Sequence, residues 1–305
     1  MGRGNPEGGP RHLPSQSGTP GDPPPGVASA ARHEPPARAG ADPPARGFGY
    51  GLVKPPRLEP VPYAALRRLP PLFAEWVAGP PARGEQLLPP PPREPGALRV
   101  HLEALLRRPL PRAEVAGVLE AQNAALGADA AALTAIAALR QPGTVAVLTG
   151  QQVGLLGGPL YTWYKALTAL VVARRWGEAL GIPCVPCFWL ASEDDDFAEV
   201  DHAFLPARRG GPVRLQYQPE GGFGHTLPAT CRLTAAIGPI LAAAGEAFAG
   251  EPAAAEVAAL LHACYAPGVT LAGAFSRLMV RLLSPLGLVL VDPADPALKR
   301  LAAPA

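Results

Sequence analysis

The sequence predicts an α/β protein whose core is a Rossmann-like parallel sheet. Short apolar runs at residues 144–149, 184–190 and 287–291 have the length and composition of buried parallel strands. A glycine-rich loop and a long helical stretch separate the first two runs. The order strand, loop, helix, strand is that of a βαβ unit, and a parallel sheet with helices on its faces follows from it.

The N-terminal region differs sharply in composition from the rest of the chain. Its first 50 residues contain 10 Gly and 11 Pro. Proline removes backbone donors and glycine costs backbone entropy, so we expect residues 1–55 to be disordered. Acidic residues in this stretch argue against a transit peptide, which is the alternative interpretation.

Residues 56–140 are expected to form a mostly helical preface to the core. From Leu98 to Ala138 the apolar residues recur at helical spacing. Asp129 is placed to cap a helix that ends near Leu139, before the Pro142-Gly143 breaker. The Rossmann-like core is then expected over 141–305.

The core begins with the strand at 144–149 and the loop Gly150–Gly158. Pro159 is expected to open a helix, because the first helical position tolerates proline. The apolar residues of this helix fall on one face at helical spacing, namely Leu160, Tyr164, Leu167 and Val171. The helix should close around residues 177–181.

The remaining core elements follow the second strand at 184–190. Residues 211–234 resemble short strands and loops with a turn at Gly221-Gly222. Residues 235–265 are expected to be helical with a break at 250–252, and 270–283 to be a further helix. The third buried strand, 287–291, ends at Asp292.

Charge and cysteine content narrow the function classes. The formal net charge is +2 with no basic stripe, which disfavours nucleic acid as a partner. The apolar runs are shorter than a membrane span, and four cysteines are typical of a reducing cytoplasm. Cys184 and Cys187 form a CxxC inside a predicted strand, so we expect buried thiols, not a redox or zinc site.

The loop Gly150–Gly158 is the first candidate binding element. A loop before a helix N-terminus favours an anion, although a tight turn needing glycine is an equal alternative. Gln151 and Gln152 stand at the carboxyl end of the strand, where ligands bind. One of them can simply satisfy loop carbonyls, and we expect at least one to touch substrate. Lys165 is positioned to reach an anion in the loop; alternatively it lies over aromatic neighbours at the surface.

The acidic run Glu193–Asp196 is the second candidate. It can bind Mg²⁺, an ammonium or sugar hydroxyls, whereas Ser192 and Asp195 also fit a helix capping box. Asp194-Asp195-Asp196 after an apolar strand also fits the metal site of a glycosyltransferase, which is a rival enzyme class. His202 comes soon after, and taken alone it suits a structural role.

Residues 149–202 resemble the signature region of the bacillithiol-biosynthesis cysteine-adding family. The segment contains TGQQ-x-G, GPLYT-x-YK, a PxFW-like strand and SED-x-DF-x-E-x-x-H, and 270–299 also resembles the family. The resemblance implies a ligase that joins cysteine to glucosaminyl-malate by an amide bond, on a Rossmann-like core. ATP and Mg²⁺ are chemically reasonable cofactors, but the sequence leaves them unknown, and no metal ligand is assigned.

The resemblance also implies the site residues, position by position. The substrate-binding set is Thr149, Gly150, Gln151, Gln152, Gly158, Pro159 and Tyr161. The catalytic set is Lys165, Glu193, Asp194, Asp196 and His202.

Two departures from the family pattern matter. Asp195 stands where the family has a histidine, which argues against a general base at that position. The family continues beyond residue 305 with more core and a dimer-forming coiled coil. We therefore expect an incomplete sheet with an exposed edge and no family-type dimer, and an inactive binding domain is the non-enzyme alternative.

Overall fold

The structure is a computed structural model that describes residues 65–66, 69–78, 95–206, 211–219, 221–224 and 226–303. The tail 1–55, expected to be disordered, lies outside the described residues. No helix in the described part of the chain is long and apolar enough to cross a membrane.

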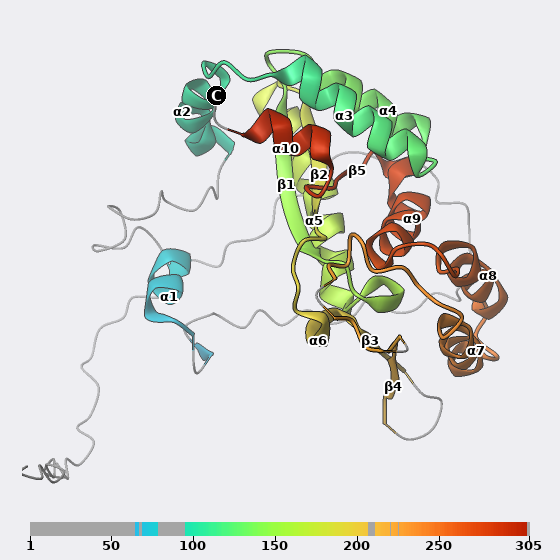
Figure 1. Ribbon diagram of the computed structural model, residues 1–305. Coiled ribbons are helices and arrows are strands. Elements are labelled where there is room, and N and C mark those ends of the chain that lie inside the picture. Colours follow the sequence, from blue (N-terminus) through green and yellow to red (C-terminus); the bar gives the residue numbers. More distant parts are fainter. Residues whose placement is uncertain are drawn as a thin grey trace, which may run out of the picture. The chain divides into compact units, whose positions relative to one another are not determined.

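A parallel sheet of three strands forms the centre, as the sequence predicts (Figure 1). The strands β1 (Val145–Gln152), β2 (Cys184–Ala191) and β5 (Val289–Val291) lie in the order β1-β2-β5. Strand β1 continues to Gln152, because Gln151 and Gln152 pair with Leu190 and Ala191 of β2. The expectation that both glutamines belong to the following loop is therefore wrong.

Helices cover both faces of this sheet, and alternate residues of β2 point to the two layers. Phe188 and Leu190 pack with α5 (Leu160–Leu180) and α9 (Leu271–Leu283). Val185 and Cys187 pack with α3 (Arg112–Ala125) and α4 (Ala130–Leu139), joined by Leu298 of α10 (Pro296–Ala302). Two of the expected helices of the preface, α3 and α4, thus form one layer of the sheet's cover.

Helix α5 does not bury the apolar face expected from its sequence. Leu160 and Tyr164 are 66% and 61% exposed, and Leu167 and Val171 are also exposed. Apart from Leu180 near its end, the buried residues of this helix are small, namely Thr162, Ala166, Ala169 and Ala173. Small side chains let the helix approach the strands closely, so its bulky apolar residues face outward.

The remaining helices and strands are α1 (Pro71–Ala78), α2 (Pro95–Leu106), η2 (Leu155–Gly157), α6 (Phe197–Val200), β3 (His202–Leu205), β4 (Val213–Gln216), α7 (Ile237–Phe248), α8 (Ala254–Cys264) and η3 (Ser284–Leu286). Of these, η2, α6, β4, α7 and α8 pack with α9 in a second hydrophobic cluster. Strands β3 and β4 pair antiparallel. Helices α7, α8 and α9 confirm the expected helical stretches and the break between them. The Asp129 side chain caps α4 as expected, accepting from Ala131 N.

Two side chains close the outer edge of β5. Asn123, fully buried, accepts from Leu290 N at 3.0 Å and donates to Leu290 O at 2.9 Å. Gln122 likewise accepts from Asp292 N at 3.1 Å and donates to Asp292 O at 3.2 Å. Residues 290 and 292 are the alternate positions whose backbone groups face away from β2, so these amides replace a neighbouring strand. On the β5 side, the expected exposed edge is absent at these positions.

The cysteines of β2 are free thiols within the sheet. Cys187 is buried and Cys184 is half-buried. Burial raises the pKa of the Cys187 thiol to about 12 and also raises that of Cys184. The prediction of buried thiols is confirmed for Cys187 and holds in part for Cys184.

Candidate active site

A cavity of about 340 Å³ lies at the carboxyl end of β1. Its walls come from the end of β1, the start of α5, helix α6 and the first residue of β3. The polar residues among its lining are Gln151, Gln152, Tyr161, Glu199 and His202. In α/β sheets the carboxyl ends of the strands are where ligands bind, so this cavity is the candidate site.

Lys165 begins a chain of hydrogen bonds that runs into the cavity. Its Nζ donates to Gly150 O at 2.7 Å and to Gln151 Oε1 at 2.9 Å. Since an ammonium only donates, the oxygen of the Gln151 amide must face Lys165. Gln151 Nε2 is then free to donate to Gln152 Oε1 and to Tyr161 Oη, both at 2.7 Å.

Carboxylates end this chain at its other side. Gln152 Nε2 donates to Asp194 Oδ2 at 3.0 Å and to Glu199 Oε2. Because a carboxylate only accepts, it fixes the orientation of the second amide as Lys165 fixes the first. The two adjacent glutamines thus connect a cation to a pair of anions and hold them apart. This gives the site a positive pole and a negative pole.

The buried carboxylate of Asp201 holds the ring of His202. Asp201, 5% exposed, contacts His202 Nδ1 through Oδ1 at 2.9 Å and accepts from Gln216 Nε2 through Oδ2 at 2.7 Å. An ionised carboxylate accepts, so Nδ1 carries the proton, and in the neutral imidazole Nε2 then has a free lone pair. An imidazole positioned in this way can take a proton from a substrate.

The loop after β1 is shaped by internal contacts. Its glycine amides donate within the loop, with Gly154 N to Gln152 O, Gly157 N to Gly154 O and Gly158 N to Leu155 O. Gly157 N also contacts the buried Tyr265 Oη at 3.1 Å, and burial raises the pKa of that phenol. The glycine amides therefore form no open anion cradle, and Lys165 is the group left to meet an anion.

Gly150 is required by the close approach of two strands. A Cβ at this position would lie 2.8 Å from Trp189 O, a backbone atom of β2. The residue also provides the carbonyl that holds Lys165. Gly150 thus belongs to the expected binding set because of its backbone: it lets the two strands approach closely and it holds Lys165.

Several expected site residues lie apart from the cavity. Glu193 forms an ion pair with Lys299 of α10, and Asp195 and Asp196 are exposed. Ser192 donates to Asp292 Oδ1 at 2.6 Å and caps no helix, so the capping-box interpretation is wrong. Pro159 is part of the lining. Five expected site residues do not line the cavity, namely Thr149, Gly150, Gly158, Lys165 and Asp194, and of these Lys165 and Asp194 reach it through the glutamine chain.

The acids do not gather into a metal site. Of the run 193–196, only Asp194 joins the glutamine chain, and its Oδ1 accepts from Asp196 N. Among the residues that the structure describes, no three His, Cys, Asp or Glu side chains are grouped to hold a metal ion. Nothing in this arrangement favours the glycosyltransferase alternative.

Three residues that matter here were not singled out from the sequence. Glu199 had a signal, because it is the Glu of the E-x-x-H pattern. Asp201 precedes His202 directly, but adjacency alone does not indicate a contact. Gln216 comes from β4 and reaches Asp201 through the β3–β4 pairing, which no local pattern reveals.

Known proteins match the part of the chain that carries this site. The model of the family "Bacillithiol biosynthesis BshC, N-terminal Rossmann-like domain" matches residues 91–305. A Koribacter versatilis protein is 40% identical over 207 residues, covering 68% of this chain, and a Salinibacter ruber protein is 37% identical over 208 residues. Both carry the provisional name cysteine ligase BshC, and this chain spans 38% of the length of each. The chain belongs to the BshC family of bacillithiol biosynthesis, through the family's N-terminal Rossmann-like domain.

Proposed function

We propose that this chain carries the substrate site of a ligase that joins L-cysteine to glucosaminyl-malate, forming an amide in bacillithiol biosynthesis. The observation that carries the proposal is the glutamine chain along the cavity, which has Lys165 at one end and Asp194 and Glu199 at the other. The provisional name of the relatives, cysteine ligase, supports the substrate class.

The two poles suit an amino acid zwitterion. In the proposed complex the cysteine ammonium lies against Glu199 and Asp194, and Lys165 attracts a substrate carboxylate. Charge-assisted hydrogen bonds of this kind contribute about 1.5–3 kcal/mol each. The Lys165 side chain is exposed, so a second, larger substrate can reach it.

Amide formation also requires removal of a proton from the attacking amine. In the proposed step the sugar amine attacks the activated cysteine carbonyl carbon, a C–N bond forms, and the leaving group departs with the C–O electron pair. His202 Nε2 accepts the amine proton, and Asp201 stabilises the resulting imidazolium. Activation of the carboxyl needs an energy source, which this proposal does not assign to residues of the chain.

Calorimetry of the 305-residue chain with L-cysteine and, separately, glucosaminyl-malate tests the proposal. Glu199→Gln keeps the shape of the side chain but removes the negative charge, so cysteine should bind at least tenfold more weakly. Glu114→Gln, on the exposed first turn of α3, is the matched control and should bind as the wild type does. Equal cysteine affinity in all three proteins, or no cysteine binding by the wild type, contradicts the proposal.

A further inference from the structure

A second, smaller cavity lies at the carboxyl ends of β2 and β5. Its volume is about 200 Å³. It is lined by Leu190 of β2, by Leu290 of β5 and by Asp292, which follows β5, together with residues from the end of α3 and the start of α9. The carboxyl ends of parallel strands are where α/β sheets bind ligands, so this position suits a second binding site.

The carboxylate of Asp292 has one oxygen left for a ligand. Its Oδ1 accepts from Ser192 Oγ at 2.6 Å and from Ala294 N at 3.0 Å. Among the residues that the structure describes, no donor reaches Oδ2 and no cation pairs with Asp292. Asp292 is half-buried and lines the cavity, so a ligand there can donate to Oδ2.

Two hydroxyl groups add to this carboxylate. Ser276, 4% exposed, donates its proton to Ala272 O at 2.7 Å, so it meets a ligand as an acceptor. Thr270 Oγ1 accepts from Gly273 N at 3.0 Å, and its own proton can be donated to a ligand. With Asp292, the cavity thus offers two acceptors, one of them charged, and one hydroxyl donor.

This set of groups disfavours a phosphate or carboxylate ligand. The start of a helix attracts anions through its free amides. The first amides of α9, however, already donate within the protein, Leu271 N to Cys231 O, Ala272 N to Pro228 O and Gly273 N to Thr270 Oγ1. In the part of the chain that the structure describes, no Lys or Arg lines the cavity. A ligand that donates from hydroxyl groups fits the cavity better.

The walls between the polar groups are apolar and set the size of the ligand. They are formed by Ala125, Leu126, Leu190, Ala272 and Leu290. A sugar ring has hydroxyl groups at its rim and C–H groups on its faces, so it matches acceptors set in an apolar wall. The volume of about 200 Å³ is below the roughly 300–1,000 Å³ of pockets for drug-sized ligands, which suits a single ring.

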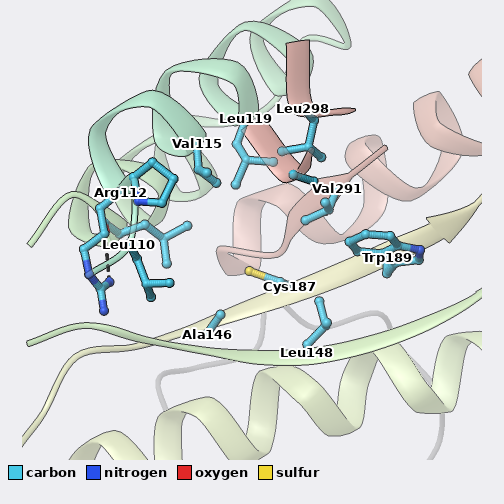
Figure 2. A pocket seen from close by; sticks show the side chains of 13 residues that line it. Leu110, Arg112, Val115, Leu119, Ala146, Leu148, Cys187, Trp189, Val291 and Leu298 are labelled. Atoms are coloured by element: carbon cyan, nitrogen blue, oxygen red, sulfur yellow. Dashed lines mark hydrogen bonds between the residues drawn. The ribbon is translucent and has the colours of Figure 1, made fainter. Parts of the chain in front are cut away.

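A larger groove on the other face of the sheet lacks these groups. Its volume is about 340 Å³, and apolar side chains such as Leu119, Leu148 and Leu298 line it (Figure 2). The charged side chain in its lining, Arg112, already donates to Leu139 O and Thr144 O. No carboxylate or hydroxyl side chain is among the described residues of this lining, so the groove does not suit a sugar.

We propose that the smaller cavity binds the sugar ring of glucosaminyl-malate. Asp292 Oδ2 accepts from ring hydroxyls, Ser276 accepts from another, and Thr270 donates to a ring oxygen. This choice of ligand rests on the function proposed above, whereas the preference for a hydroxylated ring rests on the cavity alone.

The two cavities lie near enough for one substrate to reach both. They flank the end of β2, because Gln152 of the first cavity pairs with Ala191, and Leu190 lines the second. Neighbouring strands are about 4.8 Å apart, so β1 and β5, on either side of β2, are separated by about 10 Å. A ring held at Asp292 can therefore direct its amino group toward cysteine in the first cavity.

Saturation-transfer NMR of the 305-residue chain with methyl α-D-glucoside tests the site. This ring is neutral, so the carboxylates of the first cavity do not attract it. Asp292→Asn keeps the oxygen that Ser192 and Ala294 bind but replaces Oδ2 by an amide donor, and affinity should fall at least fivefold. Ala125→Leu should fill part of the cavity and have a similar effect. Its exposed neighbour outside the lining provides the matched control, Ala124→Leu, which should bind as the wild type does.

Calorimetry of the same proteins links the ring to the substrate. Asp292→Asn and Ala125→Leu should each weaken glucosaminyl-malate binding at least fivefold, with cysteine affinity and melting temperature unchanged. Absence of glucoside binding by the wild type overturns the inference, as does unchanged affinity for the glucoside or for glucosaminyl-malate in both variants. Adenosine binding that Asp292→Asn abolishes, without glucoside binding, also overturns it, by making a ribose the ligand. Loss of both sugar ligands in the variants, in a protein that does not bind cysteine, supports the sugar site and contradicts only the reaction proposed above.

Discussion

Asp201 holds the imidazole of His202 by its Nδ1 atom, at 2.9 Å, from a buried position behind the cavity. The second oxygen of the same carboxylate is occupied by Gln216. Asp201 therefore cannot turn toward the substrate without losing a hydrogen bond, and its role is to position His202. The first prediction follows from this relationship.

Asp201→Asn is expected to change the tautomer of His202. The amide can present its oxygen to Gln216 and its nitrogen to His202, so Nδ1 becomes the acceptor and Nε2 carries the proton. Nitrogen chemical shifts of the ring measure the protonation of each atom directly. An unchanged Nδ1–H signal in the variant would show that Asp201 does not set the tautomer.

Lys165→Ala is expected to weaken the binding of an anionic substrate without unfolding the protein. Loss of a charge-assisted hydrogen bond costs about 1.5–3 kcal/mol, equivalent to about tenfold or more in affinity. Calorimetry with cysteine and with glucosaminyl-malate measures this, and Lys299→Ala, whose partner is Glu193 outside the cavity, is the control. Unchanged affinity together with a lower melting temperature would assign Lys165 a structural role instead.

Asn123→Leu is expected to destabilise the chain more than Gln122→Leu. The leucine leaves the buried N–H and C=O of Leu290 without partners, and each such group costs about 1–3 kcal/mol. Gln122 is half-buried, so water can replace part of its contacts. Urea unfolding gives the order, with the exposed Gln141→Leu as control. If the Asn123 variant and the control unfold at the same urea concentration, the Asn123 side chain does not stabilise the edge of β5.

The thiol of Cys187 is expected to react slowly with thiol reagents in the folded chain. Its pKa of about 12 keeps it protonated at pH 8, whereas the half-buried Cys184 should be modified first. The raised pKa favours the folded state below the ordinary value of 9.0, and this contribution is lost as pH rises from 9.0 to about 12. The wild type should therefore lose stability over that interval more steeply than Cys187→Ala. Parallel pH curves for the two proteins would contradict this.

The sequence predicts the sheet and its helices well because their signals are local. The runs at 144–149 and 184–190 carry their own apolar pattern, and Asp129 precedes the helix that it caps. The prediction of which face of α5 is buried is wrong. Helical periodicity shows which residues share one face of a helix, but it does not show which element packs against that face. The alanines at 166, 169 and 173 pack on the sheet by virtue of their size, which a count of bulky apolar residues ignores.

The candidate site was predicted in part, for the same reason. Gln151, Gln152, Tyr161 and Lys165 lie close in sequence to one strand end and one helix start, so their meeting follows from a single βαβ unit. The split of the acidic run, in which Asp194 turns to the glutamines and Glu193 to Lys299, depends on where α10 lies. That placement is a property of the assembled fold.

The contact between Gly157 and Tyr265 has a consequence for the order in which the chain matures during synthesis. The loop before α5 is made more than a hundred residues ahead of the hydroxyl that fixes its amide. A longer delay, of 167 residues, separates Asn123 from Leu290. When only the chain up to β2 has left the ribosome, the loop before α5 still lacks the Tyr265 hydroxyl, and α3 still lacks β5. The candidate site is expected to reach its final form late, when α8 and then β5 have left the ribosome and packed against residues synthesised long before.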